Sequence, residues 1–135
     1  MERSDLVEAL ASVLSGDPDA PVAAWLYGSR ARGAARVDSD VDVAILTGGP
    51  RARRLQELPT ALAGRLEDRV GLPVQIVVVD HAPVDLIHRI LRDGIRLLDR
   101  DPAERVRFEV KARNQYFDLL PYLRQYRAAV LGRLS

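Results

Sequence analysis

Apolar residues near the start of the chain change from helical to strand spacing. The first set recurs at helical intervals and comprises Leu6, Val7, Leu10, Val13 and Leu14. Ser4 is a suitable N-cap for this helix, and the turn signal Gly16-Asp17-Pro18 ends it. The apolar run over 22–27 has the length of a buried strand and stops at Gly28. A second strand is predicted over 39–47, where acidic and apolar residues alternate before the run becomes wholly apolar.

The middle of the chain predicts a turn, a helix and a third strand. Gly48-Gly49-Pro50 has the composition of a turn, and the helical face that follows it is formed by Leu55, Leu58, Leu62 and Leu66. Pro59 lies within this segment and should kink or divide it. Gly71 ends the helix, and the apolar run over 74–79 is the third strand.

The last third of the chain is mostly helical. Pro83 opens a short helix that ends at Gly94, and residues 95–98 can add a short edge strand. A long helix is predicted over 102–134, with a kink or break at Pro121. Strands and helices in this order favour an α+β fold, in which a small mixed β-sheet is flanked by helices and followed by a long C-terminal helix.

Composition agrees with one globular domain. The chain has 135 residues, 47% apolar and 29% charged, so we expect a single domain over 1–135 whose core needs no covalent staples. The absence of cysteine excludes disulfides and thiolate metal sites, and two histidines are too few for a typical zinc site. No apolar run approaches the ~20 residues that span a bilayer, and no secretory signal pattern is present, so a cytoplasmic protein is expected.

Charge is distributed unevenly along the chain. A net charge of +1 argues against a general nucleic-acid binder that works by neutralising phosphates. Residues 102–135 nevertheless carry seven basic and three acidic residues, so this segment is a candidate surface for a partner or a phosphate. It also holds Tyr116, Tyr122 and Tyr126, whose combination with arginine is typical of interfaces, whereas Phe117 is expected in the core.

Candidate chemistry begins with two aspartates. Side chains two residues apart on a strand point to the same face, with α-carbons about 6.6 Å apart, so Asp40 and Asp42 can converge on a hard cation. Magnesium favours oxygen ligands from one or two carboxylates together with substrate phosphates. The preceding loop suits a phosphate, because its glycines allow close backbone approach, the Ser29 hydroxyl can donate a hydrogen bond, and Arg30 or Arg32 offsets negative charge.

These residues form a known pattern. Gly28-Ser29, ten intervening residues and Asp40-x-Asp42 match the signature Gly-Ser-x10-Asp-x-Asp, so the chain resembles the polymerase-beta-like nucleotidyltransferases. It is most similar to the minimal nucleotidyltransferase (MNT) group, and within it to the antitoxins that are paired with HEPN-domain toxins. The resemblance implies the nucleotidyltransferase fold, ATP as substrate, and Mg²⁺ held by Asp40 and Asp42. The implied catalytic residues are Gly28, Ser29, Asp40 and Asp42, and the implied nucleotide contacts are Gly28, Ser29, Arg30, Arg32 and Ser39.

The same resemblance implies a reaction and a partner. An acceptor hydroxyl attacks the α-phosphorus of ATP in line, and pyrophosphate leaves. For the antitoxins of this group the acceptor is a tyrosine of a HEPN ribonuclease toxin, which implies a hetero-oligomer with that toxin and no direct contact with nucleic acid or membrane. Two alternatives stay open. One is an MNT-fold antitoxin of weak or no activity that neutralises its partner by binding, and the other is a nucleotidyltransferase that acts on a small molecule.

One position departs from the family pattern. Members of the family commonly bring a third aspartate from the next strand, and Gln75 stands at that place here. A glutamine carbonyl can ligate a metal, but it brings no charge and cannot act as a general base. Asp80 lies too far along the strand to replace the aspartate, whereas Asp38 shares the parity of Asp40. The sequence therefore predicts nucleotide binding with slow transfer.

Overall fold

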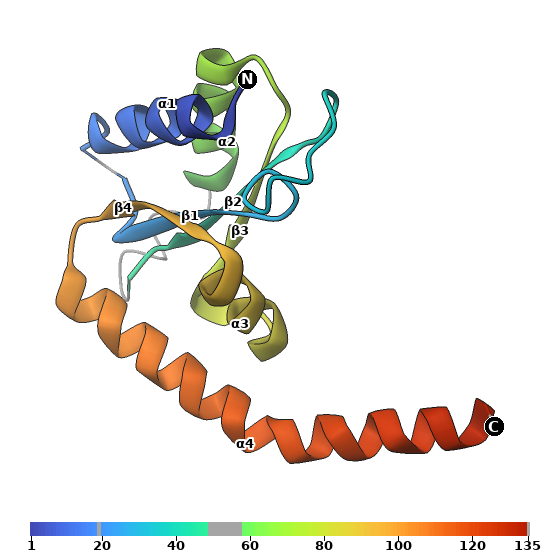
Figure 1. Ribbon diagram of the computed structural model, residues 1–135. Coiled ribbons are helices and arrows are strands. Elements are labelled where there is room, and N and C mark those ends of the chain that lie inside the picture. Colours follow the sequence, from blue (N-terminus) through green and yellow to red (C-terminus); the bar gives the residue numbers. More distant parts are fainter. Residues whose placement is uncertain (19, 49–57, 135) are drawn as a thin grey trace.

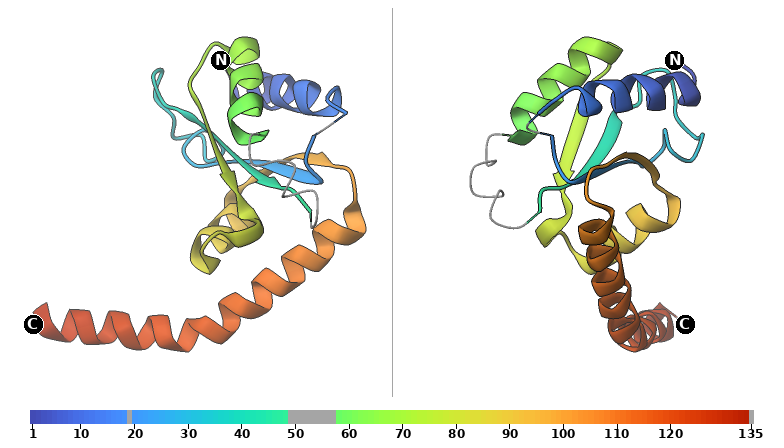
Figure 2. Two further views of the ribbon diagram at one scale, coloured as in Figure 1. Left: turned by 180° about the vertical axis from the view of Figure 1, so that it is seen from behind. Right: turned by 90° about the vertical axis from the view of Figure 1, so that its left-hand side faces the viewer.

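The computed structural model describes residues 1–18, 20–48 and 58–134, and it has three layers, with a central sheet between two layers of helices (Figures 1 and 2). Helices α1 and α2 cover one face of the sheet, and α3 with the first part of α4 covers the other. The elements are α1 (Arg3–Ser15), β1 (Ala23–Tyr27), β2 (Val41–Leu46), α2 (Leu58–Val70), β3 (Val74–Val78), the short 3-10 helix η2 (Val79–His81), α3 (Val84–Asp93), β4 (Ile95–Asp99) and α4 (Pro102–Leu134).

The four strands form a mixed sheet in the order β3-β2-β1-β4. β1 pairs antiparallel with both β2 and β4, whereas β2 and β3 run parallel. The predicted α+β fold, with a small mixed sheet, flanking helices and a long C-terminal helix, is confirmed. β2 begins at Val41, two residues later than predicted, because the preceding turn includes Ser39, whose amide donates to the Arg36 carbonyl at 3.1 Å.

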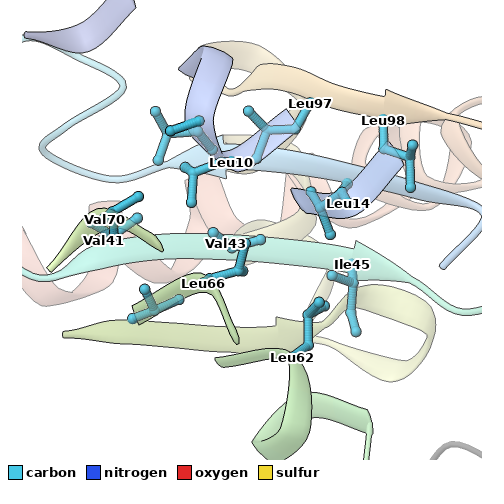
Figure 3. Close-up of a cluster of buried hydrophobic side chains, with 14 of the residues drawn as sticks. Leu10, Leu14, Val41, Val43, Ile45, Leu62, Leu66, Val70, Leu97 and Leu98 are labelled. Carbon is cyan, nitrogen blue, oxygen red and sulfur yellow. The ribbon is translucent and has the colours of Figure 1, made fainter. Parts of the chain in front are cut away.

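Each face of the sheet carries its own hydrophobic cluster. The first lies under α1 and α2, which present buried leucines four residues apart, and Figure 3 labels its members Leu10, Leu14, Val41, Val43, Ile45, Leu62, Leu66, Val70, Leu97 and Leu98. On the opposite face, Trp25 of β1 and Ala44 of β2 belong to the second cluster, together with Ile87 and Ile90 of α3. This second face matters for function, since its uncovered end carries the predicted site.

The two prolines that were expected to disturb helices behave differently. α2 begins one residue before Pro59, which places the proline in the first turn, where a missing N–H costs no helical hydrogen bond. The earlier part of this prediction lies outside the described residues, namely Gly49, Pro50 and Leu55. α4 continues through Pro121 without a break, and Figure 1 shows that it bends part-way along its length.

The core position predicted for Phe117 is wrong. Its side chain is 59% exposed, because α4 packs against α3 over its first part and then leaves the body of the molecule (Figure 2). The spacing of apolar residues in a helix shows which side chains share a face, but it does not show what covers that face. Within the described residues, no helix combines the length and the apolar character needed to cross a bilayer.

Candidate active site

A row of three side chains lies where β1 ends and β2 begins. Tyr27 pairs with Asp42 across the antiparallel strands, and Asp42 pairs with Gln75 across the parallel strands. Directly paired residues of neighbouring strands point to the same face, so these three side chains lie side by side. Their face is the one on which Trp25 lies in the cluster under α3. Asp42 and Tyr27 are half-buried and Gln75 is exposed, which puts the row at the open end of that face.

The backbone of Gly28 lies against the Asp42 carboxylate. Its φ is +73°, in the left-handed region that favours glycine. A β-carbon placed on Gly28 would lie 2.3 Å from Asp42 Oδ2, so a larger residue would collide with the carboxylate. The loop that continues into Ser29 therefore starts directly beside Asp42, as expected for a backbone that brings phosphate close to the aspartates.

Two carboxylates share this end of the sheet. Burial raises the pKa of Asp42, the neighbouring charge of Asp40 raises it further, and Arg32 lowers it. Asp40 is exposed and lies one residue before β2. The structure thus brings the predicted aspartate pair together and leaves it with an excess of negative charge that favours a cation.

Arg30 and Ser39 stabilise the loop between the two strands. Arg30 is only 8% exposed, and its Nε and Nη2 atoms donate to the Ser39 carbonyl at 3.0 and 2.8 Å. Nη2 also donates to the carbonyls of Arg36 and Val37, both at 3.3 Å. Ser39 Oγ accepts a hydrogen bond from the Arg36 amide at 2.8 Å. These contacts favour a structural role for Arg30 and Ser39, and their contact with the nucleotide stays a prediction.

Substituting Arg30 and substituting Arg32 should therefore have different effects, the first on stability and the second on ATP binding. Arg30→Ala removes hydrogen bonds from a buried cation, so the free energy of unfolding is expected to fall by about 2 kcal/mol. Arg32→Ala changes an exposed side chain, so stability should hold while ATP affinity falls about tenfold through lost charge. Urea unfolding and calorimetric titration with Mg-ATP measure the two effects. Equal stability of both variants would contradict the assignment for Arg30.

Comparison with known proteins agrees with this geometry. The family model described as "Polymerase beta, Nucleotidyltransferase" matches residues 8–103. The chain belongs to this nucleotidyltransferase family. A solved structure described as a minimal nucleotidyltransferase is 32% identical, and the match covers 70% of this chain and 95% of that one with a TM-score of 0.53. No curated protein matches the chain.

Solved toxin–antitoxin complexes contain chains of similar fold. In one, a toxin–antitoxin with AMP-PNP, the similar chain is 21% identical over 95% of this chain and 97% of its own, with a TM-score of 0.66. Another is a tri-AMPylated Shewanella oneidensis HEPN toxin in complex with an MNT antitoxin, with 18% identity over 98% of both chains and a TM-score of 0.61. At these identities the likeness shows a shared fold.

The residues of this nucleotidyltransferase fit the Mg²⁺ that the family implies. Mg²⁺ prefers oxygen ligands, commonly one or two carboxylates plus substrate phosphates and water. Asp40 and Asp42 would supply two carboxylates, and the Gln75 amide lies in register beside Asp42. In the part of the chain that the structure describes, no group of three or more His, Cys, Asp or Glu side chains is arranged to hold a metal. The remaining ligands would therefore have to come from the nucleotide and water.

The nucleotidyltransferase has no third aspartate beside this pair among the described residues. Asp80 accepts hydrogen bonds from the Thr47 amide and hydroxyl, both at 2.9 Å, and from the Gly48 amide at 3.2 Å, so it lies at the far end of β2. Asp38 lies in an exposed turn, where the strand parity that linked it to Asp40 does not apply. Gln75 thus stands alone beside Asp42 on β3.

Two residues of this end of the sheet were missed in the sequence. Burial raises the pKa of Tyr27, Asp42 raises it further, and Arg89 lowers it, so Arg89 of α3 also acts on the site. Tyr27 has a readable signal, because it lies two residues after the buried Trp25 and so shares its face. Arg89 has none, since its position depends on how α3 packs across the sheet.

Proposed function

We propose that this protein is an antitoxin that uses Mg-ATP to transfer AMP to a tyrosine of a HEPN ribonuclease toxin. The observation that carries the proposal is the contact between the Gly28 backbone and the Asp42 carboxylate, beside Asp40. This arrangement supports the proposal, because transfer of a nucleotidyl group requires a loop that can bind phosphate next to carboxylates that can bind a metal.

The chemistry assigns each residue a task. The acceptor oxygen attacks the α-phosphorus of ATP, the bond to the bridging oxygen breaks, pyrophosphate leaves, and the hydroxyl proton passes to solvent. Ser29 and the adjacent loop would hold the phosphates, and Arg32 would offset their charge. Mg²⁺, when bound by Asp40 and Asp42, would neutralise negative charge on the phosphates.

A tyrosine acceptor suits a site with two carboxylates. Its hydroxyl has an ordinary pKa near 10, so it needs less help in losing its proton than an aliphatic alcohol does. Solved structures of related fold support the choice of partner, because they include a toxin–antitoxin with AMP-PNP and an AMPylated HEPN toxin with its MNT antitoxin. Those matches cover 95% or more of this chain and so include much of α4, whereas the minimal nucleotidyltransferase covers 70%.

The test combines the purified protein and Mg-ATP with the product of the neighbouring gene, which the proposal requires to be a HEPN protein. We expect mass additions of AMP on a tyrosine of the HEPN protein and loss of its ribonuclease activity. Asp40→Asn should form no adduct, while both proteins still bind each other. If the unmodified HEPN protein is inhibited without any adduct, the transfer reaction is wrong.

Gln75 favours a second candidate function, in which the protein neutralises its partner mainly by binding. Without a third carboxylate, transfer should be slow, so stoichiometric contact would carry more of the inhibition. Gln75→Asp separates the two functions, because it adds a charged oxygen ligand in register with Asp42.

We expect Gln75→Asp to raise Mg²⁺ affinity by about tenfold, equivalent to about 1.4 kcal/mol, and to raise the transfer rate at low Mg²⁺. Gln75→Asn, which keeps an amide of reduced reach, is the control and should not raise either. Transfer rates measured over a range of Mg²⁺ concentrations check this result. Unchanged rates in Gln75→Asp would show that the third carboxylate is dispensable here.

A further inference from the structure

The two halves of α4 have different surroundings. In the first half, Arg105 Nε lies 3.0 Å from Asp99 Oδ2 of β4, and Ala112 is buried in the second hydrophobic cluster. The Tyr116 ring stacks on His88 of α3, with ring centroids 3.6 Å apart. Beyond this stack, α4 extends past the body of the domain (Figure 1 and the left view of Figure 2). The first half is therefore part of the domain, and the second half extends from it.

We call residues 117–134 the arm. Its large apolar side chains lie in solvent, with exposed fractions of 59% for Phe117, 69% for Tyr122, 70% for Tyr126 and 66% for Leu131. Tyr122 and Tyr126 are four residues apart, and Val130 follows after four more, so these three side chains form one stripe along the helix. A stripe of aromatic and aliphatic side chains at this spacing is the pattern by which a helix binds in a groove.

The exposed arm lacks the packing that normally stabilises a helix. Most helical stability in proteins comes from packing of one face of the helix, and Pro121 removes one backbone hydrogen bond from this one. The match to the family model ends at residue 103, so the arm lies outside it. A second surface is therefore needed to bury its apolar side chains and to hold it helical.

Charge identifies the kind of surface. The arm contains three basic residues, Arg124, Arg127 and Arg133, and one acidic residue, Asp118, at its start, so residues 119–134 are purely basic. Two arms packed side by side would bring like charges together, so a second copy of this chain is disfavoured. A nucleic acid would satisfy the arginines but not Val130 and Leu131. A protein groove with an apolar floor and acidic rims satisfies both groups, and tyrosine and arginine are the residues that contribute most at such interfaces.

We propose that the arm docks into an apolar groove with acidic rims on the protein that receives AMP. The arm thereby holds this partner while the partner's tyrosine reaches the nucleotide site at Asp42. The inference rests on the proposed function for the partner, but it assigns binding to a segment separate from the nucleotide site. The arm therefore determines affinity for the partner, and the residues at the end of the sheet determine the chemistry.

The experiment compares two double variants of the full chain, with the neighbouring-gene HEPN protein as the probe. Tyr122→Ala/Tyr126→Ala removes the aromatic part of the stripe. Val106→Ala/Val110→Ala is the matched control, because these residues are also exposed on α4, at 45% and 47%, but lie in its first half. Calorimetry gives the dissociation constants for the HEPN protein and for Mg-ATP. Steady-state kinetics gives KM for the HEPN protein and kcat for AMP transfer.

We expect the tyrosine variant to bind the HEPN protein about thirtyfold more weakly, with KM raised equally and both kcat and Mg-ATP affinity unchanged. The control should behave as wild type. Hydrogen exchange provides a second readout, since amides of 119–134 should exchange quickly in the free protein and become protected in the complex. Unchanged HEPN affinity in the tyrosine variant, or no protection on binding, would overturn the inference.

Two other outcomes would also overturn it. If wild type forms a dimer that dissociates in the tyrosine variant, the arm binds a second copy of this chain. If wild type binds a single-stranded RNA and the tyrosine variant does not, the arm binds a nucleic acid. Failure of the proposed function has a different result. In that case wild type forms no AMP adduct on the HEPN protein, although binding still depends on Tyr122 and Tyr126.

Discussion

Asp42→Asn is expected to lower the rate of AMP transfer by about a thousandfold, because it removes the carboxylate around which the site is built. The substitution keeps the shape of the side chain, and Asp42 lies between Tyr27 and Gln75 on paired strands, so the sheet should be unaffected. Single-turnover transfer to the HEPN protein at saturating Mg-ATP measures the effect.

The same substitution should not lower the stability of the protein. Because the pKa of Asp42 is raised in the folded state, the ionised carboxylate opposes folding at neutral pH. The protonated form of Asp42 contributes its full stabilisation at pH values below the pKa that Asp42 has in the unfolded chain. This contribution is lost as the pH rises through the higher pKa that Asp42 has in the folded protein. Asn carries no charge, so at pH 7 without Mg²⁺ the Tm of Asp42→Asn should equal or exceed that of wild type. A clearly lower Tm would mean that the loss of transfer reports misfolding.

The site could be found in the sequence because its residues form a short motif of fixed spacing. Burial and the neighbouring charge of Asp40 raise the pKa of Asp42, and carboxylates perturbed in this way concentrate at functional sites. The strands and helices were also predictable, because each apolar run has the period of its element. The relative positions of the paired carboxylates and the preceding glycine depend only on spacing along β1, the loop and β2, and this spacing can be read directly from the sequence.

Other features depend on contacts between distant segments, and no local pattern contains them. Arg30 looks like a phosphate ligand in the sequence, yet loop closure turns its guanidinium towards the Ser39 carbonyl. Arg89 reaches the site only because α3 packs across the sheet. Phe117 has helical spacing that suits a core, and its exposure follows from the direction in which α4 leaves the domain. In each case the missing information is the path of the chain in space.

Gly28→Ala should reduce AMP transfer by about a hundredfold, because the Asp42 carboxylate must move to make room for one methyl group. The new β-carbon would meet Asp42 Oδ2 at 2.3 Å, far inside contact distance. Two costs are combined here, since alanine at a φ of +73° also strains the backbone by about 1 kcal/mol. Gly33→Ala separates them. Gly33 has a φ of +71°, but the nearest atom to its added β-carbon is Arg3 Nη1 at 3.8 Å.

Both alanine variants should therefore lose similar stability from the backbone, and only Gly28→Ala should lose transfer. Chemical denaturation and the transfer assay, run on the two variants in parallel, give both quantities. If Gly33→Ala lost as much transfer as Gly28→Ala, loop strain would be responsible and the contact with Asp42 would have no special part. If Gly28→Ala lost transfer and Gly33→Ala did not, the close approach of the loop backbone to Asp42 would be the feature that lets this small fold work as a nucleotidyltransferase.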